Sequence, residues 1–142
     1  MCLVDLDPGD PRFQEDAVPV LSELRPHLSA RSAAQVYEEG YGQGLRFSAV
    51  YLDGRCVGVA GWRIVATMMA RRKLHVDDLV TTERCRSRGV GSFLLAALME
   101  RAKESGCAVL DLDSGSQRVE AHRFYEREGF EKTAFHFAQL ID

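Results

Sequence analysis

A short loop of arginines and glycines, RSRGVGS at residues 86–92, constrains this chain more than any other stretch. The segment before it, Leu74–Val80, has the composition of a strand, and the segment after it, Phe93–Ala102, has that of a helix. The first N–H groups of a helix lack intrahelical acceptors and carry partial positive charge. The glycines allow an anion to approach the backbone, and the arginines add positive charge. The stretch therefore predicts an anion site, suited to the pyrophosphate of a nucleotide-containing cofactor.

The composition is that of an ordinary globular protein. A chain of 142 residues with 46% hydrophobic residues predicts one domain, residues 1–142, with a buried core. The net charge of −3 argues against nucleic-acid binding, and no apolar run approaches the roughly 20 residues that span a bilayer. We therefore expect a cytoplasmic protein without a nucleic-acid or membrane partner and without a metal, and a homodimer stays open. The four cysteines, Cys2, Cys56, Cys85 and Cys107, lie far apart without C-x-x-C spacing, which favours reduced thiols.

Hydrophobic periodicity predicts strands and helices along the whole chain. Asp53-Gly54 between two strand-like runs predicts a hairpin turn. Pro19 is expected to split the first helix or to mark the start of a shorter one, and Ser32 with Gln35 has the spacing of a capping box. We expect strands at Leu3–Leu6, Phe47–Leu52, Arg55–Val65, Leu74–Val80 and Ala108–Leu112, helices at Phe13–Leu24, Ser32–Glu39, Phe93–Ala102 and Gln117–Glu128, and one or two closing strands within Phe130–Leu140.

Two known phosphate-binding patterns fit the loop poorly. A P-loop needs a lysine directly after its last glycine, and Gly91 is followed by serine. A dinucleotide fingerprint needs a third glycine where this chain has Leu94, although Asp111 and Asp113 lie at a suitable distance for a ribose carboxylate. A dinucleotide-dependent oxidoreductase therefore stays only as a weaker alternative.

Two motifs together resemble the GNAT N-acetyltransferase superfamily. Residues 86–91, RSRGVG, match its acyl-CoA loop pattern Q/R-x-x-G-x-G/A, and residues 121–130, AHRFYEREGF, match its A-x-x-F-Y-x-x-x-G-F ending. The motifs occur in the family's order with a strand between them. The resemblance implies a GNAT α/β fold, in which helices flank a mixed, mostly antiparallel twisted sheet.

The resemblance also implies which residues bind acetyl-CoA as cosubstrate. The loop residues Arg86, Arg88, Gly89, Val90, Gly91 and Ser92 would hold the pyrophosphate, mainly through backbone N–H groups. The backbone of Leu79 and Val80 would pair with the pantetheine arm. In the family, that arm enters a gap between this strand and the next, here Val109–Asp113.

Tyr125 matches the family's general acid, which protonates the departing thiolate. A phenol with an ordinary pKa of about 10 can donate a proton to a developing thiolate when it is well positioned. The simpler alternative is that Tyr125 only packs beside Phe124. Many members have asparagine three residues before the alanine of the second motif, where this chain has Arg118. Arg118 therefore takes the place of a cofactor-binding residue, with a substrate contact or a solvated helix start as alternatives.

A direct transfer needs a neutral amine, so a base or a water must remove a proton. His75 falls where several family members have a basic residue, and Asp77 lies two residues later on the same strand face. We expect His75 and Asp77 to serve the acceptor amine, with a solvent-exposed strand end as the alternative. Glu38 and Glu39 are further candidates for the base or for binding a cation, but their positions favour the simpler interpretation of a solvated helix face. His122 is expected to be structural or exposed, and Cys85 and Cys107 to be packing residues.

The resemblance implies an acetyl-CoA-dependent N-acetyltransferase that acts on a primary amine, either a small molecule or a lysine or N-terminal peptide. Transfer would occur by direct attack of the amine. A CoA-binding regulatory module without significant turnover is the alternative from another class.

Overall fold

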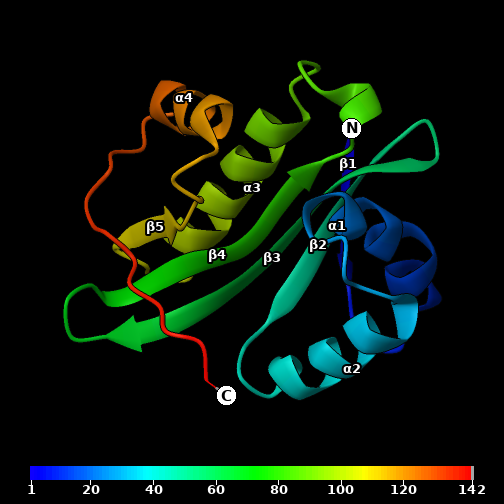
Figure 1. Ribbon diagram of the computed structural model, residues 1–142, viewed down its shortest axis with the longest axis horizontal. Helices are drawn as coiled ribbons and strands as arrows, with labels where there is room; N and C mark the ends of the chain where they lie inside the picture. Colours follow the sequence, from blue (N-terminus) through cyan, green and yellow to red (C-terminus); the bar gives the residue numbers. More distant parts are fainter. Residues whose placement is uncertain (142) are drawn as a thin grey trace.

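A twisted sheet whose strands lie side by side in chain order forms the centre of the molecule (Figure 1). The computed structural model describes residues 1–141, and the sheet within them has five strands. Only the last pair is parallel, which confirms the predicted mixed, mostly antiparallel sheet. A dinucleotide-binding fold, which needs a parallel sheet, is not what the chain adopts. The strands are β1 (Cys2–Leu6), β2 (Arg46–Leu52), β3 (Arg55–Thr67), β4 (Arg71–Thr81) and β5 (Val109–Leu112).

Helices cover both faces of the sheet. The helices α1 (Val18–Leu24) and α2 (Ala30–Tyr41) bury an apolar cluster against one face, with Tyr37 and Phe47 at its centre. The long helix α3 (Val90–Glu104) packs on the other face. The last helix, α4 (Val119–Arg127), lies beside the start of α3 (Figure 1).

The starts of α1 and α2 follow from proline placement and serine capping, and the expected start of α2 needs one correction. A π-helical turn, Phe13–Ala17, leads into α1, and Pro19 lies in the first turn of α1, where a missing N–H is tolerated. This confirms that Pro19 marks the start of a shorter helix. The expected start of α2 at Ser32 is wrong, because Ser29 caps the helix. Ser29 and Ser32 each accept a hydrogen bond of 3.0 Å from the other's backbone N–H.

The hairpin between β2 and β3 turns at Asp53 and Gly54 as expected. Both residues have positive φ, +52° and +77°, which a type I′ turn requires. On β3, a Cβ at Gly58 would lie 2.7 Å from Cγ1 of Val90. The missing side chain therefore lets α3 settle closely on β3.

The sheet opens between β4 and β5. The register of β3 against β4 shifts at Gly61 and Trp62, so that Asp77 is an extra residue, a β-bulge, on β4. The ladder between β4 and β5 ends at Val76, although β4 continues to Thr81. Beyond Val76, the β5 side of β4 therefore lacks a neighbouring strand within the described residues.

The expected closing strands within Phe130–Leu140 are wrong. Residues 131–141 form neither strand nor helix, and the side chains of Phe135 and Phe137 are 90% and 92% exposed. An alternating pattern shows only that a segment suits a pleated sheet, and the ladder itself needs a partner strand. In the part of the chain that the structure describes, no helix has the length and apolar composition to cross a membrane.

Candidate active site

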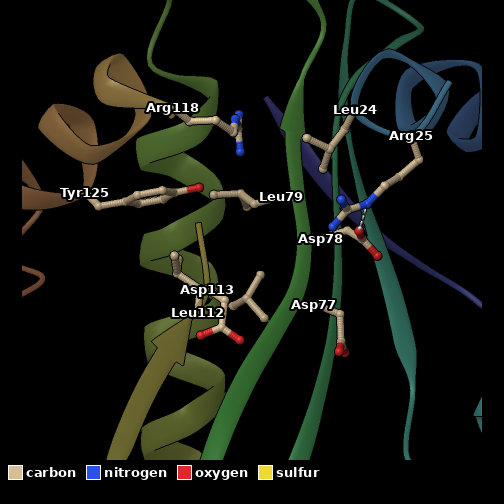
Figure 2. A pocket seen from close by; sticks show the side chains of 10 residues that line it. Leu24, Arg25, Asp77, Asp78, Leu79, Leu112, Asp113, Arg118 and Tyr125 are labelled. Atoms are coloured by element: carbon tan, nitrogen blue, oxygen red, sulfur yellow. Dashed lines mark hydrogen bonds and ion pairs between the residues drawn. The ribbon is translucent and has the colours of Figure 1, made fainter. Parts of the chain in front are cut away.

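A small polar cleft lies at the opening of the sheet, between β4 and α4 (Figure 2). Two of its walls come from the bulged part of β4 and the end of β5, and the others come from the end of α1 and from α4. The sequence-predicted residues Asp77, Leu79, Arg118 and Tyr125 all line it. The remaining lining residues are Leu24, Arg25, Val76, Asp78, Leu112 and Asp113.

The two acids of the β4 bulge are each paired with an arginine. Asp77 Oδ2 accepts a hydrogen bond from Arg63 Nε at 2.9 Å, and Asp78 Oδ1 accepts one from Arg25 Nε at 2.9 Å. Arg63 comes from the neighbouring strand β3, whereas Arg25 reaches over from the end of α1. The two acids of the bulge are therefore each paired with a cation, whereas Asp113, the third acid of the lining, lies 3.8 Å from His136 Nδ1.

Tyr125 lies on the opposite side of the cleft, with its hydroxyl directed toward Leu79 (Figure 2). Its ring packs against Phe124 and Phe130, with centroids 5.4 and 5.9 Å apart. Burial raises the pKa of the Tyr125 hydroxyl, while the nearby Arg118 guanidinium acts to lower it. Tyr125 thus both packs its ring against neighbouring aromatic rings and places its hydroxyl in the cleft. Because its pKa is raised, the hydroxyl is protonated at neutral pH.

The loop at residues 86–92 has the backbone that an anion site needs. Ser87 and Gly89 have positive φ, +68° and +82°, and Gly89 is the N-cap residue directly before α3. The first hydrogen bond of α3 runs from Phe93 N–H to the Gly89 carbonyl at 3.0 Å, so the N–H groups of residues 90–92 have no intrahelical acceptor. Arg86 and Arg88 are exposed beside them. These features fit the pyrophosphate of acetyl-CoA.

Gly91 has a role that the sequence did not indicate. A Cβ on this residue would lie 2.9 Å from Cζ of Phe124, so the missing side chain makes room for the ring. Gly91 therefore also lets α3 pack against α4, and its part in the approach of an anion stays a prediction. The two sequence motifs are therefore in direct contact.

His75 lies just behind the cleft and does not line it. Its Nε2 is 4.0 Å from Asp77 Oδ1, so the two residues are close, as their spacing predicted. The nearer partner is Asp111 on β5, whose Oδ1 lies 2.7 Å from His75 Nδ1. Sequence reasoning considered Asp111 only as a ribose ligand. A charged residue within the short apolar strand β5 was the available signal.

The other candidates lie away from the cleft. Glu38 and Glu39 are exposed on α2, and His122 is partly buried, with its Nε2 2.7 Å from the Gly115 carbonyl oxygen. Cys85 and Cys107 pack against the apolar cluster beneath α3, as expected. Within residues 1–141, no group of three or more His, Cys, Asp or Glu side chains is arranged to hold a metal ion.

Comparisons with known proteins point to one family. A family model, acetyltransferase (GNAT) family, matches residues 12–130. The chain is 32% identical over 132 residues to uncharacterized N-acetyltransferase YhdJ of Bacillus subtilis (strain 168), covering 89% of this chain and 90% of that protein. It is 35% identical over 153 residues to aminoalkylphosphonate N-acetyltransferase of Salmonella typhimurium (strain LT2), covering 92% of this chain and 97% of that protein.

A solved structure shares the fold at low sequence identity. Aminoglycoside N-acetyltransferase AAC(6')-Iy in complex with CoA matches with a TM-score of 0.85 and 17% identity, covering 99% of this chain and 93% of that chain. The family model spans most of this chain, and both curated relatives match over nearly their whole length. The chain therefore belongs to the GNAT acetyltransferase family and is an acetyl-CoA-dependent N-acetyltransferase.

Proposed function

We propose that this chain, acting as one domain over residues 1–142, transfers the acetyl group directly to a primary amine in the cleft beside β4. The observation that carries the proposal is the opening of the sheet beyond Val76, with Tyr125 on one side and Asp77 on the other. The proposed acid, Tyr125, and the proposed proton-accepting residue, Asp77, therefore line one cleft, where β4 lacks a neighbouring strand on its β5 side within residues 1–141.

The loop at residues 86–92 would bind the pyrophosphate through the free N–H groups of the first turn of α3, aided by Arg86 and Arg88. The backbone of Leu79 and Val80, beyond the end of the β5 ladder, would bind the pantetheine arm. Bound acetyl-CoA supplies an activated thioester carbonyl. Positioning and backbone hydrogen bonding would then lower the barrier for amine attack.

Tyr125 would act as the general acid in this scheme. Its hydroxyl keeps its proton at neutral pH, because burial raises its pKa. That proton would be transferred from Tyr125 Oη to the thiolate as the acetyl group leaves.

The charges of the cleft favour an acceptor that carries an anionic group in addition to its amine. Asp77 and Asp78 are already paired with arginines, which leaves Asp113, 3.8 Å from His136 Nδ1, as the one carboxylate of the lining without an arginine partner within residues 1–141. Arg25 uses Nε for Asp78, and its terminal nitrogens have no acceptor within residues 1–141. The Salmonella relative is named for aminoalkylphosphonates, which combine an amine with such an anion. We propose the same class of acceptor here. Arg25 would bind the anionic group of the acceptor, and Arg118 would bind the cofactor.

Thiol release from acetyl-CoA tests this proposal. The assay would compare aminoalkylphosphonates with amino acids, polyamines, aminoglycosides, aryl amines and lysine or N-terminal peptides. Charge-assisted hydrogen bonds contribute about 1.5–3 kcal/mol, so 2-aminoethylphosphonate should exceed propylamine roughly 10-fold or more in kcat/KM. Arg25→Gln should remove most of that difference. Equal rates for the two amines would refute the acceptor class, and no thiol release with any amine would refute acetyl transfer to amines.

A further inference from the structure

Asp111 and His75 form a hydrogen-bonded pair where the sheet begins to open. In the parallel ladder between β4 and β5, His75 is opposite Asp111, and only one further pair, Val76 with Leu112, follows. The side chains of His75 and Asp111 are 24% and 37% exposed. The pair is therefore partly shielded from water and is held by paired backbone on both strands.

Both carboxylate oxygens of Asp111 are engaged by β4. Oδ1 lies 2.7 Å from His75 Nδ1, and Oδ2 lies 2.8 Å from Lys73 Nζ. His75 and Lys73 are two residues apart, so they project from the same face of the strand. Burial opposes ionisation of Asp111, but the hydrogen bonds from Lys73 and His75 outweigh it and lower the pKa of this carboxyl. Asp111 is therefore ionised at neutral pH and can only accept hydrogen bonds.

An ionised partner decides which ring nitrogen of His75 carries the proton. Nδ1 must donate its N–H to Asp111, so the lone pair of the neutral ring is on Nε2. Nε2 points toward Asp77, which lines the cleft, with 4.0 Å between Nε2 and Oδ1. The basic nitrogen is thus the one nearest the acceptor site.

We propose that Asp111, held by Lys73, is a positioning residue that fixes His75 with Nε2 as the proton acceptor for the substrate amine. This inference rests on the proposed transfer to a primary amine. An N–H bond of the substrate ammonium breaks, and its proton passes by way of Asp77 or a water molecule to Nε2. The freed electron pair on the amine nitrogen then attacks the acetyl carbonyl, and the C–S bond breaks as Tyr125 protonates the thiolate. The second proton that the nitrogen loses as the amide forms restores the Tyr125 hydroxyl. The imidazolium lies between Asp77 and Asp111 and later loses its proton to solvent.

The charged groups around His75 form a balanced set. Asp77 and Asp111 flank the ring, and each is paired with a cation, Arg63 on β3 and Lys73 on β4. Just beyond the end of β5, Asp113 Oδ2 lies 3.8 Å from His136 Nδ1. The two ion pairs with Arg63 and Lys73 leave no net charge around the neutral ring, and the positive charge of the imidazolium would lie between the Asp77 and Asp111 carboxylates.

The first test examines the unaltered protein. Two-dimensional NMR of ¹⁵N-labelled histidine distinguishes the two ring tautomers, and its result does not depend on finding the acceptor. At a pH where the ring is neutral, His75 should carry its proton on Nδ1. A ring with its proton on Nε2 would overturn the proposal, even if acetyl transfer to amines is confirmed.

The second test measures kinetics with Asp111→Asn. The asparagine side chain can accept a hydrogen bond from a protonated Nδ1 or donate one to an unprotonated Nδ1, so part of the Nδ1–H tautomer should be lost. We therefore expect kcat to fall roughly 10-fold or more, with the KM for acetyl-CoA unchanged. The acidic limb of the pH–rate profile should also move. Asp111→Glu, which keeps the carboxylate, should recover part of the rate.

Two comparisons separate positioning from a structural role. Asp5→Asn is the matched control, because Asp5 is also a strand carboxylate held by a hydroxyl and an arginine, Ser48 Oγ at 2.6 Å and Arg101 Nη1 at 3.0 Å. It should leave the rate unchanged. In a His75→Ala background, Asp111→Asn should cost no further activity. Additive losses, or a wild-type rate profile in Asp111→Asn, would overturn the proposal.

Discussion

Tyr125 is held by aromatic packing around its ring, and its hydroxyl lies in the cleft that Arg118 also lines. The rings of Phe124 and Phe130 hold the phenol ring, and Arg118 lies near the hydroxyl at the cleft. Tyr125→Phe keeps that packing and removes only the proton donor. We expect kcat to fall by about 100-fold, with the KM for acetyl-CoA near its wild-type value, as measured by thiol release. An unchanged kcat would contradict the general-acid role.

The pH dependence follows from the direction of the Tyr125 pKa. A raised pKa favours the neutral hydroxyl, so the acid is present at neutral pH and is lost only as the pH rises above the ordinary tyrosine range. Arg118→Gln removes the cation that favours the ionised form. The pKa of Tyr125 should then rise further, and the alkaline limb of the rate profile should move to higher pH. A move to lower pH would contradict the assigned influence of Arg118.

Single residues were predictable from the sequence where a motif marked them. Tyr125 and the loop residues follow from local patterns, and their positions at the cleft and at the start of α3 agree with those patterns. The pairing of His75 with Asp111 could not be predicted, since it depends on the register between two strands 36 residues apart. The packing of Gly91 on Phe124 depends likewise on how two helices meet.

The contact between α3 and α4 links the cofactor loop to the proposed acid. Gly91 in the first turn of α3 touches the ring of Phe124, the neighbour of Tyr125. Gly91→Ala places a methyl group 2.9 Å from that ring, so α4 must shift and take Tyr125 with it. We expect kcat to fall roughly 10-fold, because small displacements of a catalytic group are costly.

A second substitution shows whether this loss comes from the helix contact. Phe124→Leu shortens the side chain, so the Gly91→Ala Phe124→Leu double variant should recover activity relative to Gly91→Ala alone. Phe124→Leu by itself measures the cost of the smaller side chain. If the double variant is as slow as the product of the two single effects, the contact is not the cause.

Elements with strong local signals were predictable, and those that depend on partners were not. The Asp53-Gly54 hairpin and the apolar helix α3 carry their own turn and packing signals, and both occur as expected. The bulge at Asp77 has no local signature, because it exists only relative to β3. The aromatic alternation of Phe135 and Phe137 predicted a strand for which the structure provides no partner.

The proposed cofactor site draws on segments far apart in the chain, namely the loop at residues 86–92, β4 beyond Val76, and α4. A ligand that binds all three stabilises only the folded molecule. At 100 times its Kd, acetyl-CoA should contribute about 2.7 kcal/mol to the free energy of unfolding and raise Tm by roughly 5–10 °C. Differential scanning fluorimetry measures this shift.

Charge reversal in the loop provides the corresponding control. Arg86→Glu with Arg88→Glu should abolish most of the shift, because the pyrophosphate would meet repulsion. Arg31→Glu with Arg55→Glu reverses two exposed arginines elsewhere and should keep it. A full shift in the loop variant would show that acetyl-CoA binds at another place.

The opening beyond Val76 lies where the backbone pairing of β4 and β5 ends, whereas the proposed acceptor side of the cleft is lined by side chains, among them Leu24 and Arg25 at the end of α1. Substitutions at the end of α1 should therefore alter which amine is acetylated and leave the proposed acetyl-CoA site open. A single scaffold of this kind can be redirected to new amines in small steps, each of which leaves a working donor site. For enzyme engineering, libraries that vary Leu24 and Arg25 are the economical place to begin.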